Sequence, residues 1–201
     1  MRAQSAGFTL IEMGVVVAIM GILLAVGMPS MSNFILGRKA AGAAVFYQDG
    51  LALARNQAIA RNANTRLVMT ENAANGQMDW RVDICKPDTG EPCDAASSGW
   101  STLTPAANDK TLASVQRSAG AMPGPADLAQ NFAPAGATDV YFTPLGWVNG
   151  AIAPHLSRMT IAPGLNRRGA FKPLTVAITL GGIATVCDAD AAAHSPRGCP
   201  P

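Results

Sequence analysis

Residues able to perform covalent chemistry are scarce in this sequence. It contains two histidines, His155 and His194, and four cysteines. A catalytic nucleophile needs a base beside it and a third group to orient that base, yet the sequence has no GxSxG elbow, HExxH motif, P-loop or GxGxxG loop. We therefore expect no enzyme activity, no catalytic residue and no cofactor, with both histidines in exposed loops.

The cysteines form two short-range groups, Cys85 with Cys93 and Cys187 with Cys199. An even number of cysteines favours disulfides in an exported chain, although four cysteines allow more than one pairing. We prefer the two short-range pairs, because Gly, Pro and Asp residues let the intervening loops double back. Each bridge would then contribute roughly 2 to 3 kcal/mol. A zinc site at Cys187, His194 and Cys199 would lack a fourth ligand, so we expect no metal there.

Three carboxylates are close enough in the sequence to be considered as a calcium site. They are Glu71, Asp79 and Asp83. Calcium takes more oxygen ligands than these residues offer, and carboxylates on strands and loops are more commonly just solvated. We expect no bound calcium.

The basic residues best suited to binding phosphate lie in the C-terminal third of the chain. Arg167, Arg168 and Lys172 surround Gly169, and Arg197 lies in the tail. The formal net charge is only +2, so binding to DNA would have to come from such a local cluster. Solvated loop charges are the simpler interpretation, and DNA remains an alternative partner.

The most informative residue is Glu12, the only charged residue between Phe8 and Met28. At about 1.5 Å per residue this apolar segment spans about 31 Å as a helix, which is close to the thickness of a hydrocarbon core. A carboxylate at membrane depth costs about 2.5 to 3.5 kcal/mol and is usually paired and functional. A cut after Gly7 would create a new ammonium at Phe8, about one helical turn away, on this chain or on a neighbour.

The stretch Gly7-Phe8-Thr9-Leu10-Ile11-Glu12, after a polar leader and before an apolar helix, resembles the prepilin signature of type IV pilins and type II secretion pseudopilins. This resemblance implies cleavage after Gly7 by a prepilin peptidase, methylation at Phe8, and a role in assembly for Glu12. Pro29 is similarly placed to the helix-bending proline of such proteins. Lateral packing of helices is also indicated by a stripe of small residues at Gly14, Ala18, Gly21 and Ala25.

The expected fold class is α+β, with a long N-terminal helix packed on an antiparallel β-sheet domain. We divide the chain into a leader (1–7), a transmembrane and assembly helix (8–28), an amphipathic second half of the helix (29–62) and a β-rich globular domain (63–201). The apolar face expected to pack on the sheet consists of Phe34, Ala41, Val45, Ala52 and Ile59.

Alternating patterns and turn residues predict eight short strands after the helix. They are Thr65–Thr70, Asp79–Ile84, Trp100–Leu103, Thr111–Val115, Val140–Thr143, Met159–Ala162, Leu174–Leu180 and Ile183–Val186. Residues 122–137 are rich in Pro, Gly and Ala and are expected to form a loop. We expect the tryptophans to lie in the core; these are Trp80, Trp100 and Trp147.

The β-rich part resembles the FimT and GspH type of minor pilin and pseudopilin. The resemblance rests on Arg61-Asn62 at the end of the helix, Trp80 in the next strand, Gly99-Trp100, Phe142-x-x-x-Gly146 and a last strand that ends at Cys187. It implies a subunit anchored in the inner membrane of a Gram-negative bacterium, with its globular domain in the periplasm. Its partners would be other major and minor pilins, the prepilin peptidase and the inner-membrane assembly machinery.

We therefore expect a minor type IV pilin that helps to initiate a pilus, stands near its tip at the cell surface, and contributes to DNA uptake or adhesion. One alternative is a GspH-like minor pseudopilin of a type II secretion system. Another is a DNA-binding pilin for natural transformation. Some FimT-type pilins bind DNA through a Gly-Arg-x-Arg tail; this sequence has Pro196-Arg197-Gly198 and Asn166-Arg167-Arg168-Gly169 instead.

Overall fold

The computed structural model describes residues 9–85, 93–104, 113–188, 190–191 and 195–200. Within these ranges a single long helix, α1 (Leu10–Arg61), precedes a domain of short strands, as expected. The strands are β1 (Thr65–Glu71), β2 (Met78–Ile84), β3 (Val115–Arg117), β4 (Leu128–Ala133), β5 (Asp139–Phe142), β6 (Arg158–Pro163), β7 (Leu174–Ile178) and β8 (Ala184–Cys187). A short 3-10 helix, η2 (Leu165–Arg167), follows β6.

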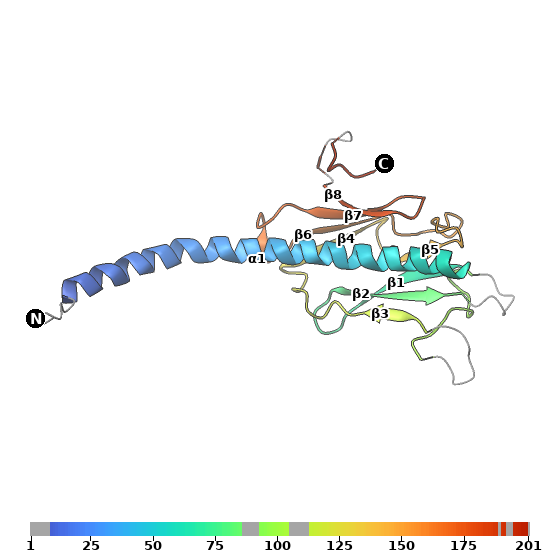
Figure 1. The fold of residues 1–201 in the computed structure, drawn as a ribbon, viewed down its shortest axis with the longest axis horizontal. Coiled ribbons are helices and arrows are strands. Elements are labelled where there is room, and N and C mark those ends of the chain that lie inside the picture. Colours follow the sequence, from blue (N-terminus) through green and yellow to red (C-terminus); the bar gives the residue numbers. More distant parts are fainter. Residues whose placement is uncertain (1–8, 86–92, 105–112, 189, 192–194, 201) are drawn as a thin grey trace, which may run out of the picture.

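The strands form two four-stranded sheets, in the orders β3-β2-β1-β5 and β4-β6-β7-β8. Every neighbouring pair is antiparallel. In the first sheet Leu67 is opposite both Val82 and Val140, so apolar residues of three strands lie on one face. Figure 1 shows the second half of α1 lying along both sheets, while its first half extends beyond the domain. The α+β architecture is confirmed.

The face of α1 that packs on the sheets is not the one expected. Phe34, Val45 and Ile59 are 58%, 50% and 47% exposed. The buried hydrophobic residues of the helix are Leu36, Ala40, Ala43, Ala44, Tyr47, Leu51, Ala54 and Ala58. Most of them are alanines, because a short side chain lets the helix approach two sheets at once. The large apolar residues chosen from the sequence lie on the opposite side.

Tyr47 and Trp80 join the helix to the sheets through polar atoms as well as apolar surface. The Tyr47 hydroxyl donates to the Met78 carbonyl at 2.8 Å and accepts from the Gln130 amide at 2.7 Å. The indole nitrogen of Trp80 donates to the Phe46 carbonyl at 2.9 Å. Burial raises the pKa of the Tyr47 phenol, so this network keeps its proton.

The end of α1 is attached to two hairpins through Arg55. Its Nε–H lies between the carbonyl oxygens of Gly146 and Gly181, at 3.2 and 3.3 Å. The helix then ends at Asn62, which adopts a left-handed conformation with φ of 50° and donates its backbone N–H to carbonyls of the last turn. Pro29 lies within the continuous helix, which curves gradually along its first half (Figure 1).

Three expectations about the β domain are wrong. Residues 122–137 were expected to form a loop because they are rich in Pro, Gly and Ala, but they contain strand β4. Trp100–Leu103 is not a strand: Trp100 makes only an isolated bridge to Cys85. Trp147 is 61% exposed, whereas Trp80 and Trp100 are buried as expected. The expected strand at 111–115 falls partly outside the described residues, and β3 begins at Val115.

Two glycines on α1 allow a matched test of how closely the helix packs. A Cβ atom on Gly50 would lie 2.9 Å from the Trp80 ring, whereas one on Gly42 would have nothing within 4 Å. We expect Gly50→Ala to lower the free energy of unfolding by about 1 to 3 kcal/mol through overpacking. Gly42→Ala should raise it by about 0.5 to 1 kcal/mol, because alanine favours helix. Thermal unfolding of the full chain in detergent measures both; shifts of the same sign would contradict the packing.

Candidate functional site

The N-terminal end of α1 carries the carboxylate singled out from the sequence. Glu12 is exposed in the first turn, and its backbone N–H donates to the Thr9 hydroxyl at 3.2 Å. Thr9 is thus the N-cap, and Thr9-x-x-Glu12 has the residue pattern of a capping box. The helix dipole favours a negative charge in this turn. Gly7 and Phe8 lie outside the described residues, so their processing roles remain predictions.

From Leu10 to Met28 the helix α1 is apolar apart from Glu12, and no other part of the described chain covers this segment. An 18-residue window has a mean hydropathy of 2.5, with no part of it buried. Leu10 and Ile11 are 90% and 79% exposed, and a Cβ atom on Gly14 or Gly21 would have nothing within 4 Å. The helix is long and apolar enough to cross a membrane. Its small residues also leave one side open to close approach by another helix.

The basic residues predicted as a phosphate-binding cluster come from two separate segments. Arg167 and Arg168 belong to η2 and its C-cap, followed by Lys172, and all three are exposed. Arg167 pairs with Asp127 at 3.3 Å, which neutralises part of the expected charge. Arg197 lies in the C-terminal tail. Among the described residues no hydrogen bond or ion pair joins Arg197 to the η2 segment.

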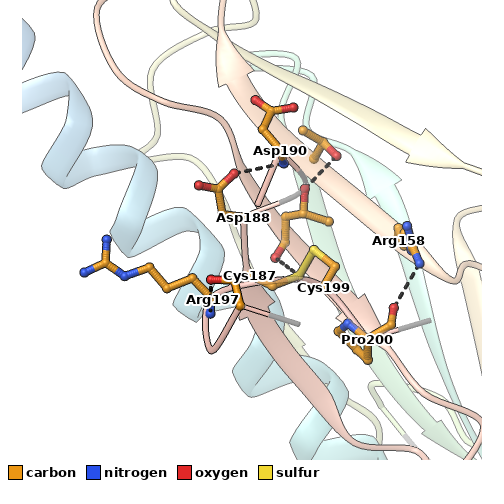
Figure 2. Close-up of a disulfide and its surroundings, with 10 residues drawn as sticks. Arg158, Cys187, Asp188, Asp190, Arg197, Cys199 and Pro200 are labelled. Carbon is orange, nitrogen blue, oxygen red and sulfur yellow. Dashed lines mark hydrogen bonds between the residues drawn. A yellow bond between two sulfur atoms is a disulfide. The ribbon is translucent and has the colours of Figure 1, made fainter. Parts of the chain in front are cut away.

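The C-terminal tail is held against β8 by a disulfide. Cys187 and Cys199 are bonded, and the backbone N–H of Asp188 donates to the Arg197 carbonyl at 2.7 Å. The Arg158 guanidinium donates to the Pro200 carbonyl at 2.9 Å. Figure 2 shows these contacts and the Arg197 side chain extending away from Arg158. The preferred pairing is confirmed here, and His194 lies outside the described residues.

The second disulfide, Cys85–Cys93, is also the preferred one, and it borders a charge network that the sequence did not reveal. Asp83 is fully buried and accepts from Arg66 at 2.9 Å and from Arg81 at 2.8 Å. The Arg66 guanidinium also lies 4.5 Å from the centre of the Trp100 ring. Strand alternation could not have placed Asp83 inside, because Val82 and Asp83 are both buried and the regular pattern breaks there.

The other residues considered for chemistry have structural partners. Asp79 accepts from the Asn72 amide at 2.9 Å and from the Ala119 backbone N–H at 2.6 Å. His155 is half-buried rather than exposed as expected, with Nδ1 at 3.1 Å from the Ile152 carbonyl. Tyr141 was not considered from the sequence; burial, with a smaller effect of Asp139, raises the pKa of its phenol. Within the described ranges no group of three or more His, Cys, Asp or Glu residues is arranged to hold a metal ion.

Two family models match the chain. The model described as "Type II transport protein GspH" matches residues 47–182, and the model described as "Prokaryotic N-terminal methylation motif" matches residues 2–28. No curated protein matches. Among solved structures, the minor pseudopilin EpsH from the Type 2 Secretion System of Vibrio cholerae is 14% identical, with a TM-score of 0.45; the match covers 76% of this chain and 99% of that one.

The buried Asp83 makes a quantitative test of the charge network. Asp83→Ala leaves Arg66 and Arg81, whose side chains are 15% and 35% exposed, without their shared carboxylate, so we expect the free energy of unfolding to fall by about 1 to 3 kcal/mol. The control Glu71→Ala removes an exposed carboxylate from the same sheet and should change it by less than about 0.5 kcal/mol. Denaturant unfolding of the full chain measures the free energy of unfolding of both variants. A loss for Asp83→Ala as small as the one expected for Glu71→Ala would show that the network is not stabilising.

Proposed function

Because the chain belongs to the GspH family of type II transport proteins, we propose that it is a minor subunit of a filament built from pilin-like proteins. The observation that carries this proposal is the uncovered first half of α1. From Leu10 to Met28 it is apolar except for Glu12, and the globular domain covers only the second half. Such a surface needs either lipid or protein around it, and a membrane-stored filament subunit uses each in turn.

The proposed mechanism begins with storage in the inner membrane as a single-pass protein whose globular domain lies in the periplasm. Cleavage after Gly7 then produces an ammonium at Phe8. As the helix leaves the bilayer, Glu12 meets the ammonium of a neighbouring subunit, and the pair fixes the register between helices because an unpaired charge in a dry interface is costly. The small residues at Gly14 and Gly21 permit close helix contact.

The two-sheet domain then faces outward and determines which subunits lie beside it. We place the protein in a type IV pilus, where it would help to initiate the filament and stand near its tip, together with other pilins. A type II secretion filament is the second candidate, because the matching family model carries that description. DNA binding is not included, since Arg167 pairs with Asp127 and Arg197 lies in a separate segment.

Glu12→Ala tests the assembly role. We expect the variant to insert and to be cleaved, because removing a charge favours membrane insertion, but its incorporation into filaments should fall by at least about tenfold. Sheared filaments and membranes are compared by immunoblot with a tagged chain. The control Glu71→Ala, at an exposed position of the domain, should assemble normally. Normal incorporation of Glu12→Ala would remove this residue from the mechanism.

The two candidate machines are separated by deleting the gene in its own organism. A pilus subunit predicts fewer surface pili with secretion of exoproteins intact, since initiation is slowed. A secretion subunit predicts the reverse. Electron microscopy and analysis of the culture supernatant give both readouts, and restoration by the wild-type chain is the control. Loss of neither activity would contradict the proposed filament role.

A further inference from the structure

The end of the globular domain nearest the membrane combines exposed apolar and basic side chains. It is formed by the α1 turns beyond the apolar segment and by the loop between β6 and β7, which reaches the helix there (Figure 1). We give the name basal face to this whole end of the domain, including the side of α1 that faces away from the sheets, where Phe34 lies. Its residues are Met31, Phe34, Arg38, Leu165, Arg168 and Lys172, all of them exposed.

Contacts place the loop at the end of the apolar segment. Arg167 lines an open groove of about 520 Å³ together with Met28 and Met31 of the helix. Further along the helix, a Cβ atom on Gly37 would be 3.5 Å from the Phe171 Cβ. The loop is therefore fixed beside the segment between Met28 and Gly37.

If the hydrocarbon core of the bilayer ends at Met28, the segment just after Met28 and the loop beside it lie in the headgroup layer. Met31 is then about 4.5 Å beyond the hydrocarbon edge, and the headgroup layer is about 5 to 7 Å thick. Arg38 stands about 15 Å beyond the edge, within reach of the surface potential. Long basic side chains can extend toward phosphates while their stems remain on apolar surface.

The chemistry of the basal face matches an interfacial surface. Leu165 is 76% exposed and does not belong to the buried core of the domain. The Arg38 guanidinium lies 5.1 Å from the centre of the Phe34 ring. Asp127 neutralises Arg167. Among the described residues, no ion pair or hydrogen bond engages the side chains of Arg168 and Lys172. Exposed apolar residues beside unpaired cations are typical of surfaces that bind anionic membranes.

We propose that the basal face binds the phosphate headgroups of anionic phospholipids while the subunit is stored in the bilayer. This inference rests on the proposed membrane-stored subunit and goes beyond it. The domain is held down on the membrane rather than tethered freely above it, and extraction for assembly must first release these contacts. Of the basic residues considered from the sequence for DNA, Arg168 and Lys172 would thus act on lipid phosphate.

The experiment uses the full chain reconstituted into vesicles of phosphatidylcholine, with or without phosphatidylglycerol. Amide hydrogen exchange is followed by mass spectrometry for residues 164–172. Each basic residue near an anionic surface is expected to contribute about a fivefold preference, so exchange should slow by at least about tenfold with phosphatidylglycerol and recover at high salt. Equal exchange in the two kinds of vesicle would overturn the proposal.

Three double variants identify the face, and two of them change the formal charge by the same amount. Arg168→Glu with Lys172→Glu should abolish the slowing, and Arg168→Gln with Lys172→Gln should reduce it without introducing repulsion. The control, Arg117→Glu with Arg197→Glu, changes the formal charge as much as the first pair at exposed positions elsewhere and should retain the slowing. Near-ultraviolet circular dichroism checks that each variant is folded. Equal loss in the control would show a general charge effect and overturn the proposal.

Two further readouts distinguish lipid binding from nucleic-acid binding and from a failure of membrane insertion. In the first readout, a duplex oligonucleotide is added to the chain in place of phosphatidylglycerol. If the oligonucleotide slows exchange of residues 164–172 and phosphatidylglycerol does not, the face binds nucleic acid and the proposal is overturned. Residues 10–28 report on insertion in the same samples and should be protected in both kinds of vesicle. Rapid exchange there would contradict membrane storage itself, whereas protection there without an effect of phosphatidylglycerol would overturn only the lipid contact.

Discussion

The structure depends on an alanine-rich helix face packed against two sheets at once. Ala40, Ala43, Ala44, Ala54 and Ala58 bring the second half of α1 so close that even one added carbon at Gly50 would meet the Trp80 ring. This contact supplies the domain with its core. It also ends where the helix leaves the sheets, so the apolar first half must find its cover elsewhere. The domain and the exposed segment are therefore two consequences of one continuous helix.

The sequence predicted the helix and most strands, because an unbroken apolar run and short alternating segments are local signals. It did not predict which face of the helix is buried. Large apolar residues such as Val45 and Ile59 were expected to be buried. The buried face instead carries small residues, because two sheets pack against it, and this tertiary arrangement cannot be read from the local sequence. Strand β4 was missed for a similar reason: Gln130 within it is polar, but its amide binds the buried Tyr47 hydroxyl across the core.

The candidate sites, too, were predicted where the signal is local in the sequence and missed where it depends on the fold. Pairing of the cysteines could be predicted because short loops restrict the choice, and both bridges are present. The basic cluster could not be judged from spacing, since Arg197 belongs to a tail folded on β8 while Arg167 is held beside α1. Asp83 was weighed as a calcium ligand, yet it pairs with Arg81, two residues earlier on β2, and with Arg66, which lies opposite it on β1 in a register that only the folded sheet reveals.

Arg55 links the end of α1 to both hairpins through the Gly146 and Gly181 carbonyls. Tyr47 and Trp80 add links to the sheets nearer the middle of the packed half. A force applied along the helix axis is therefore shared between both layers of the domain at several points. The domain would follow a pulled helix as one body, without first peeling one sheet from the other.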